Sequence, residues 1–267
     1  MQNDSKLNSK AEGIRPAFWL LILVLVLAGA VGIVLSRRNK TAPSDAVAVA
    51  SDDTAPGSVD GTTAPAAPAA ESAAKPAIPR NATGAVNANF QKYRKALLDG
   101  DGETAWSLVD SKTQHFYSQT LRDALSMQRA ELDRLDYTHK FQVLRLRTEF
   151  RKSHLEGLTG RDVFVLAVTN GWISKSAVQA ATALQRVAVN GRYAVGVIPQ
   201  DPKAPLHFIY EDSEWKLSLW KIFEFANAIG KQMKKESGLS EDDFSLALMR
   251  QLSKFEVSEK IFEGPIE

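Results

Sequence analysis

The sequence predicts an α+β fold in which helices pack on a curved antiparallel sheet. Two observations carry this prediction. The stretch from Glu103 to Glu156 contains no Gly, Pro or Asn, which is typical of helices separated by short breaks. After Gly171 the apolar residues alternate as they do in strands, and two hairpin signals follow. Ahead of this fold, the sequence predicts one transmembrane helix and a disordered linker.

The predicted transmembrane helix is residues 17–35, AFWLLILVLVLAGAVGIVL, nineteen residues without a charge. At about 1.5 Å per residue such a helix reaches roughly 28 Å, close to the hydrocarbon thickness of a bilayer. We therefore expect residues 1–16 to be a short tail and 17–35 to contact the lipid bilayer. A cleaved signal peptide is the alternative, but its apolar region is usually about 7 to 15 residues long, and this one runs directly into Arg37 and Arg38.

The membrane orientation is not decided by flanking charge, because three Lys or Arg residues lie near each end of the span: Lys6, Lys10 and Arg15, then Arg37, Arg38 and Lys40. No Lys or Arg occurs from Thr41 to Ala74, which favours export of the chain that follows. We therefore expect a single-pass protein of the cell membrane with its folded domain on the extracytoplasmic side.

Residues 36–85 are predicted to be a disordered linker. From Thr41 to Arg80 the chain holds 13 Ala and 6 Pro and no aromatic residue, so it cannot bury enough apolar surface to offset its chain entropy. Its composition is typical of bacterial proteins. The remaining residues, 86–267, suit one domain with a sizeable core.

Charge and cysteine content exclude several functions for this domain. From Val86 onward there are 25 Lys or Arg residues against 24 Asp or Glu, so the sequence carries no electrostatic footprint for nucleic acid. The chain has no Cys, which excludes disulfides, thiolate metal sites and a cysteine nucleophile.

Helices are expected first along the domain. The first ends at Gly100, Asp101 caps the second, and Thr159 with Asp162 forms a capping box for the last. The segment 141–151 reads as either strand or helix, and we favour helix; its basic residues Arg145 and Arg147 are expected on a solvated face. The expected ranges are 86–99, 104–109, 114–134, 141–151 and 163–169.

Two hairpins and two further helices follow. Asn190-Gly191 joins the strands 184–189 and 193–197, and an acidic turn at 211–214 joins 206–210 and 215–219. The closing helices are expected at 220–235 and, after the Ser240 cap, at 244–255.

Two segments of this pattern resemble the ends of NTF2-like (cystatin-like cone) domains. These are FQKYRKALLDGDGETAWSLV, Phe90–Val109, and HFIYEDSEWKLSL, His207–Leu219. The chain departs from the family in its long helical middle and in the two appended helices, about 220–255. The resemblance implies a cone-shaped cavity, and strand alternation would place His207 beside Ile209 within it. Trp172 and Trp215 are the aromatic candidates for its lining, although aromatic residues in such a fold usually serve packing.

No catalytic or metal motif accompanies these residues. The four His are not spaced as zinc ligands, and the Asp99–Asp110 segment fails as a calcium loop because Thr104 stands where Gly is needed. We therefore expect no catalytic residue, no metal and no cofactor.

The last helix carries an apolar stripe of Phe244, Leu248, Leu252 and Phe255 at helical spacing. The stripe either packs on the domain itself or forms an interface with a protein partner or a second copy. Together these features predict a membrane-anchored NTF2-like module that acts by binding or assembly in the bacterial cell envelope, without catalysis. The alternative is a tethered small-molecule-binding protein or SnoaL-like enzyme that uses the cone cavity.

Overall fold

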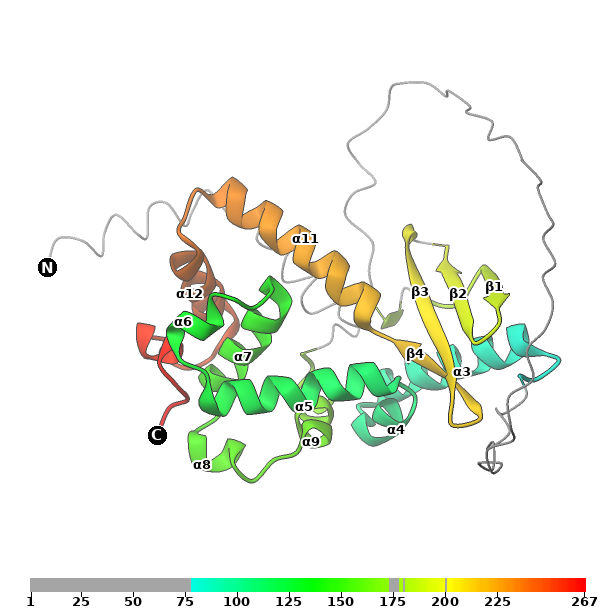
Figure 1. Ribbon diagram of the computed structural model, residues 1–267, viewed down its shortest axis with the longest axis horizontal. Coiled ribbons are helices and arrows are strands. Elements are labelled where there is room, and N and C mark those ends of the chain that lie inside the picture. Colours follow the sequence, from blue (N-terminus) through cyan, green and yellow to red (C-terminus); the bar gives the residue numbers. More distant parts are fainter. Residues whose placement is uncertain (1–77, 173–177, 180, 200) are drawn as a thin grey trace, which may run out of the picture.

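A computed structural model describes residues 78–172, 178–179, 181–199 and 201–267. They form an α+β fold whose four-stranded sheet lies with α3 at one end of the molecule, while most of the other helices lie toward the opposite end (Figure 1). The predicted transmembrane helix and most of the predicted linker lie outside the described residues. None of the described helices combines the length and the apolar character that a membrane crossing requires.

The helices precede and follow the sheet in the chain. Before it come α3 (Ala82–Asp99), α4 (Gly102–Ser107), α5 (Ser111–Ser126), α6 (Arg129–Leu132), α7 (Tyr137–Glu149), α8 (Lys152–Leu155) and α9 (Gly160–Thr169). After it come α11 (Trp220–Ser237), α12 (Glu241–Leu252) and the short 3₁₀ helix η3 (Glu259–Phe262).

The sheet is an antiparallel meander of strand order β1-β2-β3-β4. Its strands are β1 (Arg186–Asn190), β2 (Tyr193–Ile198), β3 (Asp201–Glu211) and β4 (Glu214–Ser218). Both predicted hairpins are confirmed. Gly191 takes a φ of 54° at the first turn, a value that glycine adopts without the steric cost of a Cβ atom.

Helix α3 packs across one face of the sheet and contacts both β1 and β4. Its Asn89 donates a buried hydrogen bond of 2.6 Å to the Trp215 carbonyl of β4. Residues of β2, β3 and β4 that face α3 are buried, as strand alternation requires: Ala194, Ile198, Leu206, Phe208, Tyr210, Trp215 and Leu217.

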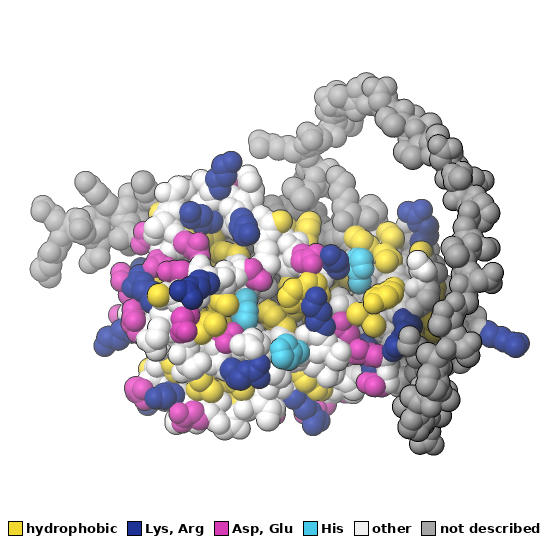
Figure 2. Space-filling model, viewed as in Figure 1, with side chains coloured by type: hydrophobic (Ala, Val, Ile, Leu, Met, Phe, Trp, Pro, Cys, Tyr) yellow, Lys and Arg dark blue, Asp and Glu magenta, His cyan; other side chains and the backbone are white. Residues whose placement is uncertain are grey.

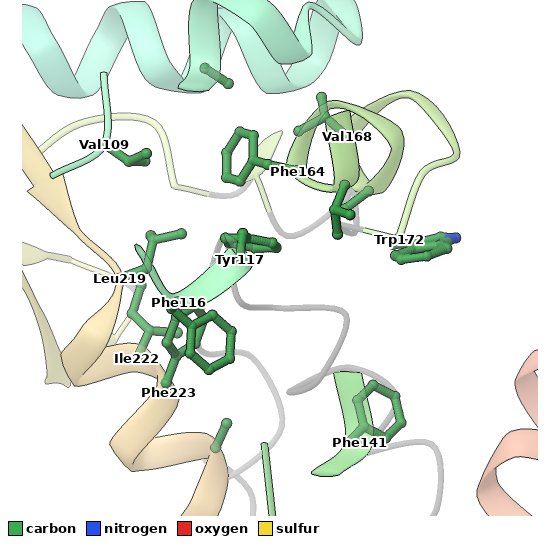
Figure 3. Packing of buried hydrophobic residues seen from close by; sticks show 14 of the residues in the cluster. Val109, Phe116, Tyr117, Phe141, Phe164, Val168, Trp172, Leu219, Ile222 and Phe223 are labelled. Atoms are coloured by element: carbon green, nitrogen blue, oxygen red, sulfur yellow. The ribbon is translucent and has the colours of Figure 1, made fainter. Parts of the chain in front are cut away.

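The helical half is built around α5, α7, α9 and α11. Figure 3 shows Phe116 of α5 against Phe223 of α11, with ring centroids 4.5 Å apart, and Tyr117 edge-on to Phe164 of α9 at 5.0 Å. Close approach of α5 and α9 requires Gly160, because a Cβ atom there would lie 2.6 Å from the backbone of Ser118.

Three of the differences between the observed helices and the predicted ranges change the argument. Helix α3 begins at Ala82, where the Asn81 side chain accepts a hydrogen bond from the Gly84 N–H, so residues 82–85 belong to the helix and not to the linker. The predicted helix 114–134 divides into α5 and α6, because the Gln128 N–H donates to the Glu131 carboxylate and starts a new helix. The last helix ends at Leu252, which leaves Phe255 outside it.

Several local predictions are confirmed. The segment 141–151 was predicted as helix, and α7 is a helix that begins four residues earlier and ends at Glu149. Gly100 ends α3 in the left-handed conformation, and Asp101 caps α4 through a 2.9 Å hydrogen bond. Thr159 and Asp162 form the capping box of α9. The expectation that Arg145 and Arg147 lie on a solvated face is wrong: α7 is enclosed by α5, α11, α12 and η3, and both side chains are buried.

Candidate functional site

Two of the four predicted cavity residues, His207 and Ile209, lie together on the sheet face opposite α3. His207 and Ile209 alternate with the buried Phe208 and Tyr210, so they lie together on this opposite face, and both are half-buried. Trp215 pairs with Tyr210 and therefore lies on the face toward α3. Trp172 lies after α9 against Phe150, 6.0 Å between ring centroids. The four residues do not converge on one site.

We define the open face of the sheet by Tyr193, Val195, Val197, His207 and Ile209. Their register places them side by side, since Tyr193 is opposite Ile209 and Val195 is opposite His207. Tyr193 is 66% exposed, and the other four are partly exposed. Figure 2 shows hydrophobic side chains gathered at this end of the molecule, over the sheet and beside α11. The open face is therefore more apolar than an ordinary solvated sheet face.

His207 is the titratable base of the open face. Its pKa is lowered from 6.5 by partial burial and by the nearby Lys221 ammonium group, while the Glu224 carboxylate acts in the opposite direction. Lys221 and Glu224 lie on the first turns of α11 and pair with each other at 2.6 Å. The imidazole is therefore largely neutral at pH 7.

The two edges of the sheet differ. The outer edge of β4 is closed by the segment after α4: the Leu217 N–H donates to the Leu108 carbonyl at 2.8 Å, and the Asp110 N–H donates to the Leu217 carbonyl at 3.0 Å. Strand β1 pairs with β2 alone among the described strands, and four of its five residues are exposed. An edge of this kind offers backbone donors and acceptors to a further strand.

The predicted stripe of the last helix is divided between core and surface. Phe244 and Leu248 are fully buried, and the Phe244 ring lies 5.9 Å from that of Tyr137 on α7. Leu252 is partly buried, and Phe255 is 58% exposed. The first half of the stripe thus belongs to the protein's own core, and only Leu252 and Phe255 remain accessible.

Sequence reasoning missed the buried cations of α7. The Lys140 ammonium group is buried and pairs with Asp133 at 2.8 Å, Glu241 at 3.1 Å and Asp242 at 3.4 Å. Arg147 is fully buried among backbone carbonyls. The one sequence feature that distinguishes them from surface cations is that polar and apolar residues are not separated onto two sides of the surrounding helix.

In the part of the chain that the structure describes, no three His, Asp or Glu side chains are grouped as a metal site would need. Comparisons of this chain with protein-family models, with curated proteins and with solved structures each found no match. The candidate site therefore rests on the geometry of the sheet.

Proposed function

We propose that this chain is a membrane-tethered binding module whose open face and β1 edge dock a protein partner in the bacterial cell envelope, without catalysis. The observation that carries the proposal is the continuity of two features: the exposed Tyr193 on β2 stands next to β1, and β1 has a free outer edge among the described strands. Apolar side chains and unpaired backbone groups together form the kind of surface to which an extended segment adds as another strand.

The predicted tether is consistent with this role. Residues 17–35 would fix the chain in the membrane, and the Ala- and Pro-rich segment would let the domain reach on the order of 35 Å from the bilayer. We place the domain on the extracytoplasmic side. A reporter that is active only outside the cytoplasm, fused after Glu267, should therefore be active; activity of a cytoplasmic reporter instead would reverse the orientation.

An NTF2-like assignment of the domain is part of the proposal. Its support is the resemblance of two segments: the helix pair α3–α4, of which α3 covers the sheet, and the last hairpin, β3–β4. The enzymatic alternative is less favoured, because His207, Trp215 and Trp172 do not share one face or one site.

Site-specific photo-crosslinking in cells tests the docking surface. A photoreactive residue at Tyr193 in the full chain should give a discrete adduct, and the same residue at the exposed Lys231 of α11 should give none. Adding Ile209→Lys, on the open face, should abolish the Tyr193 adduct. His207→Gln should retain the adduct, because the proposed docking does not require a catalytic base. Equal labelling at both positions, or no adduct at Tyr193, would contradict the proposal.

A further inference from the structure

Arg145 is a buried cation without a partner. The residue is 7% exposed, and its Nε atom is buried without a hydrogen-bond partner among the described residues. Its central carbon lies 4.2 Å from the centroid of the Trp172 ring, a cation–π contact that offsets only part of the cost of burying a charge. Burial lowers the pKa of Arg145 to about 10, so the side chain is still charged at neutral pH.

Arg147, two residues later on the same helix, shows how this fold satisfies a buried guanidinium. Its Nε donates to the Ala124 carbonyl at 2.8 Å, and its two Nη atoms donate to the carbonyls of Asp123, Met127, Ile261 and Phe262. Lys140 is likewise matched, by three carboxylates. Glu149, one turn beyond Arg145, interacts with it electrostatically but forms no ion pair with it. Among the buried cations Lys140, Arg145 and Arg147 of α7, only Arg145 keeps a buried N–H donor without a partner among the described residues.

The surroundings of Arg145 are aromatic. Trp172 covers the guanidinium, Phe150 lies 6.0 Å from Trp172, and the buried Tyr117 of α5 is close enough to influence the pKa of Arg145. An unpaired guanidinium presents a planar set of N–H donors that matches a carboxylate in a bidentate manner. The rings around it would contact an apolar group attached to that carboxylate.

We propose that Arg145 is the anchor of a binding site for a small apolar carboxylate, such as an aryl or short alkyl acid, between α5, α7 and Trp172. A single cation favours a monoanion over a phosphate dianion, because the neighbouring Arg147 and Lys140 are already saturated by their own partners. This site is separate from the open face of the sheet and does not depend on docking there.

The test uses the full chain in detergent, with sodium benzoate as the probe and sodium chloride at equal ionic strength as the blank. Titration calorimetry should detect benzoate binding, and benzoate should raise the melting temperature in a concentration-dependent manner. Arg145→Met should weaken benzoate binding by about ten- to a hundredfold, since a charge-assisted hydrogen-bonded pair is lost. The matched control Arg134→Met, on an exposed side chain, should bind benzoate as the wild type does.

A second readout separates binding from a structural role. Because the Arg145 charge is buried without a partner, Arg145→Met should keep or raise the melting temperature of the ligand-free protein. If Arg145→Met does not fold, Arg145→Lys provides the test, because it keeps the charge but loses the bidentate donors and should weaken benzoate binding. Absence of benzoate binding by the wild type, unchanged binding by the Arg145 variants, or inorganic phosphate binding as tightly as benzoate would overturn the proposal.

Discussion

Arg147 joins three segments of the chain through one side chain. Three of its acceptors, the carbonyls of Asp123, Ala124 and Met127, lie at the end of α5, where most carbonyls lack intrahelical partners and only that of Asp123 also accepts from the Met127 N–H. The other two acceptors, Ile261 and Phe262, belong to η3. The residue thus caps one helix and fixes the carboxyl-terminal segment against it. Charge alone misled the prediction here, because a basic residue is normally solvated unless acceptors are assembled around it by tertiary structure.

Replacement of Arg147 by Met is expected to destabilise the protein by about 3 to 5 kcal/mol, since five carbonyl acceptors, most of them buried, lose the hydrogen bonds that Arg147 donates. Urea unfolding of the full chain measures this as a lower midpoint. Arg134→Met, on the solvated surface, is the control and should leave the midpoint nearly unchanged. Equal midpoints for the two variants would show that water satisfies the carbonyls that Arg147 now serves.

The protonation of His207 is expected to depend on Lys221. Removing this ammonium group by Lys221→Gln should raise the pKa of His207 toward its ordinary value, both because a repelling charge is lost and because Glu224 is freed from its ion pair. Titration of the imidazole by NMR measures the change. Lys231→Gln, on the same helix, should not alter it; a lower pKa in Lys221→Gln would contradict the assignment.

The lowered pKa of His207 also makes the stability of the folded chain depend on pH. Because the pKa of His207 is lower in the folded chain than in the unfolded chain, the unfolded chain takes up the proton first as the pH falls. The folded state therefore loses stability as the pH falls below the ordinary pKa of 6.5, and this loss should be smaller in Lys221→Gln.

At the scale of elements, the sequence predicted the turns and helix ends that depend on interactions between neighbouring residues. The hairpin at Gly191, the left-handed stop at Gly100 and the capping box at Thr159 all depend on residues within one turn of each other, and all three are confirmed. The break between α5 and α6 was missed, since no Gly or Pro marks it. The open face could be predicted only in part: alternation joined His207 to Ile209, but Trp172 and Trp215 depend on packing between distant segments.

Because Leu248 of α12 is buried and Leu252 is only partly buried, the same substitution is expected to cost different amounts of stability at the two positions. Leu248→Asp places a charge at a fully buried position and should cost about 3 kcal/mol or more, whereas Leu252→Asp, at a partly buried position, should cost clearly less. Thermal unfolding of each single variant measures the difference. If Leu248→Asp instead leaves stability unchanged and alters self-association, α12 is an interface and not part of the core.

At the scale of the whole molecule, segments that are distant in sequence are held together by backbone contacts. Ile266, after η3, forms an isolated bridge with Arg151, and the segment after α4 closes the β4 edge. Contacts with the core also set the amino-terminal boundary of the folded unit. Ile78 packs against the core, and Asn81 caps α3, so the folded unit includes residues that composition assigned to the linker.

A fragment of residues 78–267 is therefore expected to melt at the temperature of the domain in the full chain, and a fragment of 86–267 is expected to melt lower. The shorter fragment loses the Asn81 cap, worth about 1 kcal/mol, and the apolar contact of Ile78, worth a similar amount. Together these correspond to a drop of about 4 to 8 °C for a domain of this size. Limited proteolysis of the full chain should likewise cut before Ile78. A protected fragment that begins near Thr41, or equal melting of the two fragments, would show that the boundary lies elsewhere.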